Sequence, residues 1–581
     1  MALSDSLKRI ASRLAPPGEG FGEVAGLRAC FLAFFAIHAV ISFFYSDTLL
    51  ASGQDHNVIH YFDAYKHPEW WSHDITDGIF GGLGLVWLLS LTSSIPVALH
   101  TFLGIPLEWF YWLEFLLKPA LLVYLLYRIA KVYAEGPWLD YAPLFMVVIM
   151  NFRILSINLN SYQSNLYINY YAASYLLLFL YGYWMLSRDR RIPLVVSAFL
   201  GPLVHASLGL LGGGLLVALA WGRRMPTKVL FAVSAAVALG LAGEMLIIRS
   251  VLSGHETLPD AIAWQGITSN GHLYFPFLNP LRFAKTVAFT ALLVFVSFRL
   301  TGARELRRDV LIAAGFVTLT IAAYFVSVWI EFRPGVQLAP MRSSVLLVLI
   351  GIVCLAARSE RSPDRLVDRM LFGSVPIGLI YLGMGRLEAI LAILLWVPSS
   401  LITTISLRRV LTWGLGFACL LGPLSLTRQA THQNQGEIQL QDFIKANFAP
   451  GTAFLAWGPY NSGFRTTTKC QLIAPTIGHG IHWNLKSIMD DELVKAGHAL
   501  GRTPAPTQLY TVDTYRALAH AQTRPITQEQ VDLFRESHQP EYLIYPSRLT
   551  SPSETWAPLY ENHEYRLYDL KTPENPQLPP N

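Results

Sequence analysis

The sequence predicts an α-helical polytopic membrane protein with about 11–13 spans and a small C-terminal extracytoplasmic α/β domain. Three observations predict this fold class. Hydrophobic residues make up 53% of the 581 residues and charged residues only 14%, which is too apolar for a soluble domain with one core. Apolar segments of spanning length recur between clusters of arginine. After Arg428 the composition becomes that of a soluble domain.

Composition also limits the kinds of partner that the chain is expected to bind. The net charge of +5 is small and unevenly distributed, so nucleic-acid binding is not indicated. Aromatic residues reach 13%, as is typical of the tryptophan and tyrosine belts at membrane surfaces. The four cysteines are isolated from one another, so the sequence contains neither a disulfide framework nor a CxxC metal motif. Membrane lipid is the partner that this composition predicts.

The N-terminal part sets the expected topology. Residues 1–26 are rich in lysine and arginine and are expected in the cytoplasm, and they are too polar for a cleaved signal peptide. A first span over about residues 27–45 then places the loop 46–78 on the outer side. That loop contains Lys66 as its only lysine or arginine, as expected of an outer loop.

The membrane domain is expected to cover residues 27–426. We interpret residues 79–104 as interfacial or re-entrant helices, because a crossing there would turn every later arginine cluster outward. Residues 107–133 are the next expected span. Further spans are expected near residues 140–156, 168–186, 229–248, 286–300, 310–330 and 343–357, followed by a hairpin of two spans and a last span near 410–426. Further along, the apolar stretch 193–221 is broken around His205, which predicts two short helices that meet in or near the outer leaflet.

The C-terminal part, residues 427–570, is expected to be an α/β domain on the outer face. GEIQLQDFIKANF has the pattern of an amphipathic helix, GTAFLAWG and EYLIYP have that of buried strands, and YENHEYRLYDL that of a terminal hairpin strand. The tail, residues 571–581, is rich in proline and asparagine and is expected to be disordered.

Polar residues that are costly near the membrane gather, in this topology, at the outer ends of spans. They occur in the first loop, after the third span, at the short-helix break and between two late spans: Asp55, His56, Asn158, Asn160, Gln163, His205, Arg333, Gln337 and Arg342. Their convergence on one side predicts an active site at the outer surface of the membrane.

This arrangement resembles the GT-C superfamily, the integral-membrane glycosyltransferases that take a sugar from a polyprenyl-phosphate carrier. The resemblance covers almost the whole chain. It rests on an acid in the first outer loop (SGQDHNVIHYFDAY), re-entrant helices, about a dozen spans, and an outer C-terminal α/β domain that opens with QDFIKANF. The chain looks most like a bacterial branch with a histidine at a short-helix break (VHASLG) and a Gln-x-x-x-x-Arg motif (QLAPMR). It has no WWD motif in the C-terminal domain, which disfavours oligosaccharide transfer to protein asparagine.

The resemblance implies that a sugar is transferred, with inversion, from a polyprenyl-phosphate donor to a cell-envelope glycan or lipid outside a bacterial inner membrane. This chemistry needs a base for the acceptor hydroxyl and cations for the leaving phosphate. Asp55 matches the family's first-loop acid, although five aspartates compete in this loop. Arg333, Arg342 and His205 are the expected phosphate or donor ligands. The weaker candidates for substrate binding are His56, Asn158, Asn160, Gln163 and Gln337.

No metal ligand set is assigned from the sequence. His56 and His60 have the i, i+4 spacing of two ligands on one helical face, and Asp63 or Asp55 could join them, but no fourth ligand can be named. Some GT-C enzymes use a divalent cation at the first-loop acid, so the resemblance implies Mg or Mn as a candidate.

Two other functions fit parts of the sequence. A lipid-linked sugar transporter or flippase would be expected to show inverted repeats, and none is visible by eye. An O-antigen ligase or polymerase would share the donor chemistry but would place its large outer segment between spans instead of at the C-terminus.

Overall fold

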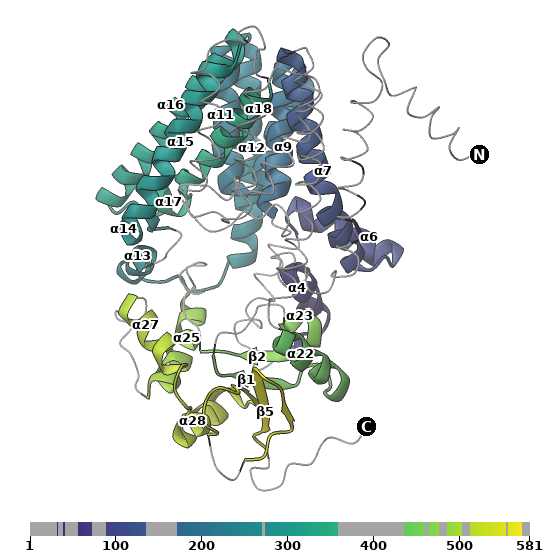
Figure 1. Cartoon of the computed structure of the whole chain (residues 1–581), viewed down its shortest axis with the longest axis vertical. Helices are drawn as coiled ribbons and strands as arrows, with labels where there is room; N and C mark the ends of the chain where they lie inside the picture. Colours follow the sequence, from purple (N-terminus) through teal and green to yellow (C-terminus); the bar gives the residue numbers. More distant parts are fainter. Residues whose placement is uncertain are drawn as a thin grey trace, which may run out of the picture.

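A computed structural model represents the chain. It describes residues 56–71, 89–134, 171–269, 273–357, 435–458, 464–475, 485–501, 512–552 and 556–571, with a few single residues between 32 and 40. A helical bundle forms one end of the molecule and an α/β domain the other, as Figure 1 shows. The polytopic helical fold with a C-terminal α/β domain is therefore confirmed.

The membrane part consists of long apolar helices and several shorter ones. Their bounds are α4 His56–Lys66, η1 Pro68–Trp71, α6 Leu91–Leu103, α7 Leu107–Tyr133, α9 Tyr171–Ser187, α10 Arg191–Val204, α11 Ala206–Gly222, α12 Thr227–Leu252, α13 Asp260–Ser269, α14 Phe275–Leu278, α15 Pro280–Leu300, α16 Arg304–Trp329, α17 Arg333–Gln337, η3 Pro340–Ser343 and α18 Ser344–Ala356.

Four helical stretches in the described part are long and apolar enough to cross a membrane: Thr227–Leu252, Pro280–Leu300, Arg304–Trp329 and Arg333–Ala356. They coincide with four of the expected spans. The expected spans before residue 56, near residues 140–156 and beyond residue 357 lie outside the described residues. In the doubtful stretch 79–104, α6 has 13 residues, or about 20 Å at 1.5 Å per residue, which is shorter than the hydrocarbon core. Its interfacial placement remains a prediction.

The break predicted at His205 is confirmed. Helix α10 ends at Val204 and α11 begins at Ala206, and the backbone N–H of Leu208 donates to His205 Nδ1 at 3.5 Å. A side chain on Gly209 would clash with the backbone of Gly201 and Pro202, so the two helices meet backbone to backbone. Neither helix, with 14 and 17 residues, is long enough to cross the membrane by itself.

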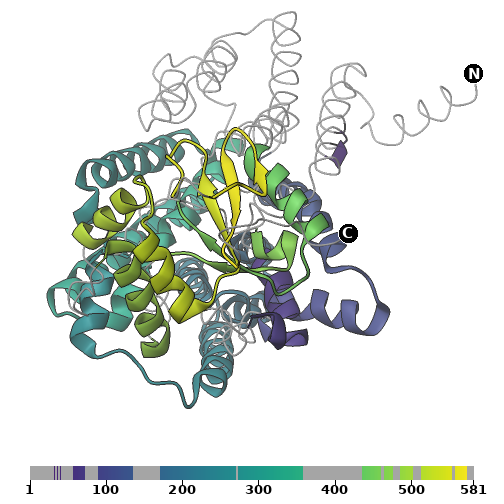
Figure 2. The same ribbon diagram turned by 90° about the horizontal axis from the view of Figure 1, so that it is seen from below.

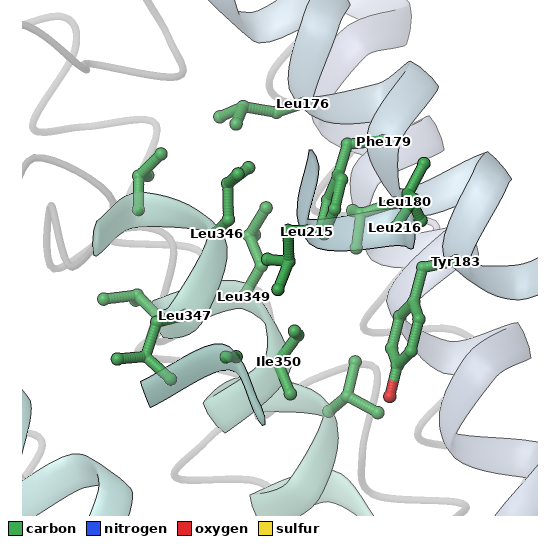
Figure 3. Packing of buried hydrophobic residues seen from close by; sticks show 14 of the residues in the cluster. Leu176, Phe179, Leu180, Tyr183, Leu215, Leu216, Leu346, Leu347, Leu349 and Ile350 are labelled. Carbon is green, nitrogen blue, oxygen red and sulfur yellow. The ribbon is translucent and has the colours of Figure 1, made fainter. Parts of the chain in front are cut away.

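Helix α18 is the centre of the bundle. All 13 of its residues are buried, which is the pattern of a helix that is apolar on every face. In Figure 3, leucines of α9 and α11 face Leu346, Leu349 and Ile350 of α18. Packing on all sides fixes the position of α18, and with it the η3 turn that precedes it.

A buried polar network joins α7, α9, α11 and α16 at the end of α11 remote from His205. Arg223 forms an ion pair with Asp309, whose side chain is completely buried. The hydroxyl of Tyr183 donates to Asp309 at 2.8 Å, and that of Tyr133 donates to Ser187 at 2.8 Å. Each group has a partner, as burial of charge requires.

The C-terminal domain has a five-stranded sheet in the order β2-β1-β3-β5-β4. The pairs β2–β1 and β1–β3 are parallel, and the pairs that involve β5 are antiparallel. Helices cover both faces (Figure 2). The bounds are α22 Gln435–Asn447, β1 Ala453–Ala456, α23 Phe464–Thr468, β2 Gln471–Ile473, α25 Lys486–Leu500, α27 Val512–Ala521, α28 Gln528–His538, β3 Tyr542–Pro546, β4 Tyr560–Glu561 and β5 Tyr565–Asp569.

The segments expected to form this domain do so. GEIQLQDFIKANF forms all but the first residue of α22, GTAFLAWG contains β1, and EYLIYP contains β3. The expected terminal hairpin strand consists of β4 and β5. Leu440 and Ile444 of α22 pack on one face of the sheet, and α25 and α28 pack on the other. Alternate strand residues therefore supply two separate cores, as in a sheet covered on both sides.

Replacing Asp309 tests the buried network. Asp309→Asn keeps the shape but leaves the Arg223 charge buried without its counter-ion, so we expect a loss of about 3–5 kcal/mol of stability. The measurement is thermal unfolding of the detergent-solubilised protein. The matched control is Asp189→Asn, which removes an exposed ion pair with Arg191 and is expected to cost about 0–1 kcal/mol. Equal effects of the two substitutions would contradict a structural role for the buried pair.

Candidate functional site

The C-terminal domain is joined to the membrane part through the segment between α12 and α13. Thr257 and Leu485 form an antiparallel β-bridge. The backbone N–H of Lys486 donates to the Glu256 carbonyl at 3.0 Å, and the two side chains form an ion pair at 2.8 Å. Leu258, which is buried, packs in the same core as α25. The segment that follows α12 is therefore attached directly to the core of the C-terminal domain.

The first loop makes a second attachment. Lys469, just after α23, forms an ion pair with Asp63 of α4. A Cβ on Gly451, at φ +88°, would lie 3.1 Å from the Cα of Trp70, so η1 packs closely on the C-terminal domain. Phe62 packs edge-on against His100 of α6 at 5.0 Å between ring centres. Figure 1 accordingly shows α4 between the bundle and the sheet.

The turn between α16 and α18 lies at the same end of the bundle. Arg333 opens α17 and forms an ion pair with Asp260, the first residue of α13, at 3.1 Å. The chain then turns at Ala339, which has a φ of +47°, and enters η3. The hydroxyls of Ser343 and Thr320 share a hydrogen bond at 2.7 Å, which fixes η3 against α16.

His205 and Arg342 come together at this turn. The η3 turn packs against α11, and Arg342 lies within electrostatic range of His205. Arg342 is half-buried. In the described part of the chain no carboxylate pairs with it. A partly buried guanidinium without a counter-ion is suited to bind an anionic group.

The expected site residues are thus only partly placed. His205, Arg333, Gln337 and Arg342 all lie at the end of the bundle that holds the C-terminal domain, with Gln337 ending α17. Of the two arginines, Arg342 is near His205 and Arg333 is paired with Asp260. The backbone of His56 opens α4. The other expected residues, Asp55, Asn158, Asn160 and Gln163, lie outside the described residues.

The tentative metal ligands of α4 have other contacts. His60 is buried edge-on against Trp71 at 4.4 Å between ring centres, and Asp63 forms an ion pair with Lys469. In the described ranges no group of three histidine, cysteine or acidic side chains could hold a metal ion. These observations do not support a metal site built on His60 and Asp63.

One residue of interest was missed by the sequence analysis. Glu244 lies in α12, in the apolar run LGLAGEMLII, and its side chain is 8% exposed. In the sequence it is visible as a single carboxylate inside an expected span. Burying such a group in a membrane helix is energetically unfavourable, and these residues usually have a function.

Comparisons with known proteins find no matching family model and no matching curated protein. Two solved structures of ArnT from Cupriavidus metallidurans resemble the fold. The apo structure has a TM-score of 0.46 and 11% identity, and the structure bound to undecaprenyl phosphate has a TM-score of 0.43 and 12% identity. Each comparison covers 94% of this chain and 99% of the other. Likeness at this level does not establish a shared activity.

Leu258 provides a test of the attachment between the two parts. We expect Leu258→Asp to release the C-terminal domain, because the substitution places a charge in a closed apolar core. Hydrogen exchange of the full-length protein should then rise in residues 485–500 and 256–263 together. Lys486→Ala is the control, since an exposed ion pair contributes about 0–1 kcal/mol. Unchanged exchange in the Leu258 variant would show that the attachment does not depend on this apolar contact.

Proposed function

We propose that this protein is a GT-C type membrane glycosyltransferase that uses a polyprenyl-phosphate sugar as donor. The acceptor is a hydroxyl of a cell-envelope glycan or lipid, on the outer side of a bacterial inner membrane. The N-terminus lies in the cytoplasm and the C-terminal domain outside. The observation that carries the proposal is the Arg342 guanidinium, partly buried beside His205 at the end of the bundle where the C-terminal domain docks.

The proposed reaction is a single inverting displacement. The acceptor hydroxyl oxygen attacks the anomeric carbon, and the bond from that carbon to the phosphate oxygen breaks with its electron pair on the phosphate. Asp55 takes the hydroxyl proton, as a positioned carboxylate can. The charge that develops on the leaving phosphate is stabilised by Arg342, because a guanidinium binds phosphate oxygens through two parallel hydrogen bonds.

The two arginines have different roles in this proposal. Arg342 is the phosphate ligand, with His205 beside it. Arg333 is held by Asp260 at 3.1 Å, so it joins α17 to α13 and orients the turn that carries Arg342. Gln337 ends α17 and lies between the two arginines in the sequence. We propose it as a weaker substrate contact, together with His56, Asn158, Asn160 and Gln163. A Mg or Mn ion remains a candidate at the first-loop acid, and no step depends on it.

Substitution of Asp55 tests the proposed base. Asp55→Asn should leave the folded protein intact and lower transfer about 10²–10⁴-fold, because proton removal is lost while the shape is kept. Transfer is measured with purified protein and radiolabelled undecaprenyl-phosphate sugars, and Glu69→Gln, at an exposed side chain of the same loop, serves as the loop control. Transfer at the wild-type rate by the Asp55 variant would remove this residue from the role.

The arginine pair gives a second prediction. Arg342→Gln should reduce transfer at least about 100-fold, and Arg342→Lys should recover only part of it, because an ammonium cannot bind phosphate in bidentate fashion. Arg333→Gln should cost less than about 10-fold, since exposed ion pairs are weak. The reverse order of effects would exchange the roles of the two residues.

Identification of the lipid that copurifies with the protein separates the proposal from its alternatives. A polyprenyl-phosphate monosaccharide that is consumed when an acceptor is added supports the transferase. Passage of the intact lipid across a proteoliposome membrane, without cleavage, would instead indicate a transporter or flippase. Consumption of a lipid-linked oligosaccharide would indicate an O-antigen ligase or polymerase.

A further inference from the structure

Glu244 is the one carboxylate of the described spans that is buried and has no partner. Its side chain is 8% exposed, and its Oε2 atom accepts no hydrogen bond. No basic side chain pairs with it among the described residues. A buried carboxyl without hydrogen bonds is destabilising in a membrane. Because no described side chain satisfies it, Glu244 is suited to bind a ligand that brings its own hydrogen-bonding groups.

Helix packing places Glu244 at the same height in the bundle as the α10–α11 junction. The buried face of α12 runs through Val233, Val237 and Gly240 to Glu244. A side chain on Gly240 would clash with the carbonyl oxygen of Phe199, and a Cβ on Gly243 would lie 3.4 Å from Leu203. Because α12 thus follows α10 towards its end, Glu244 is level with the junction of α10 and α11. His205 is the residue at that junction.

We propose that Glu244 binds hydroxyl groups of the sugar on the lipid-linked donor. The inference rests on the proposed function, because it takes the donor class from there. A carboxylate needs hydrogen-bond donors. The prenyl chain has none, and the phosphate is anionic and is assigned to Arg342. The sugar hydroxyls both donate and accept hydrogen bonds, so they are the part of a polyprenyl-phosphate sugar that suits Glu244 in either protonation state.

Two different segments thus bind the phosphate and the sugar of the donor. The η3 turn, through Arg342, binds the phosphate, and α12, through Glu244, binds the sugar. Recognition of a hydroxyl by a buried polar group is also selective, because a ligand without that hydroxyl leaves the group unsatisfied. Glu244 therefore contributes to the choice of sugar, whereas Arg342 does not distinguish one sugar from another.

The experiment compares the binding of undecaprenyl phosphate with that of its sugar-linked forms. It uses the full-length protein in detergent, without acceptor. Binding of undecaprenyl phosphate and of undecaprenyl-phosphate glucose, mannose and other hexoses and pentoses is measured by native mass spectrometry. The wild type should bind at least one sugar-linked form more tightly than undecaprenyl phosphate. Glu244→Leu should weaken that form about 10- to 100-fold, with undecaprenyl phosphate unchanged, and Glu244→Gln should lie between. Glu305→Gln, at the far end of α16, is the matched control.

Thermal unfolding of the empty protein supplies a second readout. Removal of an unsatisfied buried carboxyl should leave the Glu244→Leu protein as stable as the wild type or more stable. A destabilised variant with unchanged lipid binding would show a packing role and overturn the inference. Unchanged binding of the sugar-linked lipid by a Glu244→Leu protein of wild-type stability would also overturn it. If the wild type binds neither lipid, the proposed function itself fails.

Discussion

The site depends on the burial of α18 on all sides. This helix packs against α7, α15 and α16, and leucines of α9 and α11 face it (Figure 3), so the residue that precedes its first turn is fixed with it. Arg342 lies in η3, directly before this helix. The position of this guanidinium is thus fixed by van der Waals packing around α18, because lipid tails are as apolar as the helix and supply no hydrophobic driving force.

Residues 256–263 link the C-terminal domain to the turn that carries Arg342. Residues 256–263 contact the core of that domain at Leu258 and contact α17 through the Asp260–Arg333 pair. A displacement of the C-terminal domain would therefore be transmitted to the turn that carries Arg342. Through Lys469 and Asp63 the same domain also holds the first loop. The domain thus contacts the loop that supplies the proposed base, and it reaches the turn that supplies the phosphate ligand through residues 256–263.

Much of the fold could be predicted from the sequence. The length of an apolar stretch indicates a helix that can span the membrane, and a polar residue within the stretch indicates a break. The break at His205 is an example. The helix ends were less well predicted. Helix α16 begins at Arg304 rather than near residue 310, because its charged first turns lie outside the apolar run but continue the helix. Hydropathy locates the part of a helix inside the membrane and does not locate its ends.

Features that depend on distant residues could not be predicted. The ion pair between Arg333 and Asp260 joins α17 to α13. No pattern in the sequence indicates that these two distant residues come together. Strand β2 has only three residues, too few for a period to show. Glu244 was passed over because a single acid in an apolar run does not reveal whether a partner exists. Its burial and the missing partner only become evident in the folded structure.

The central claim is that the first-loop carboxylate and the Arg342 turn face each other at one end of the bundle. Crosslinking tests it most directly, with Gln54→Cys and Leu338→Cys introduced into a variant that lacks the native cysteines. A short bifunctional maleimide should join the two positions within one chain. If each cysteine reacts with a monofunctional maleimide but no crosslink forms, the base and the phosphate ligand do not share a site, and the account is wrong.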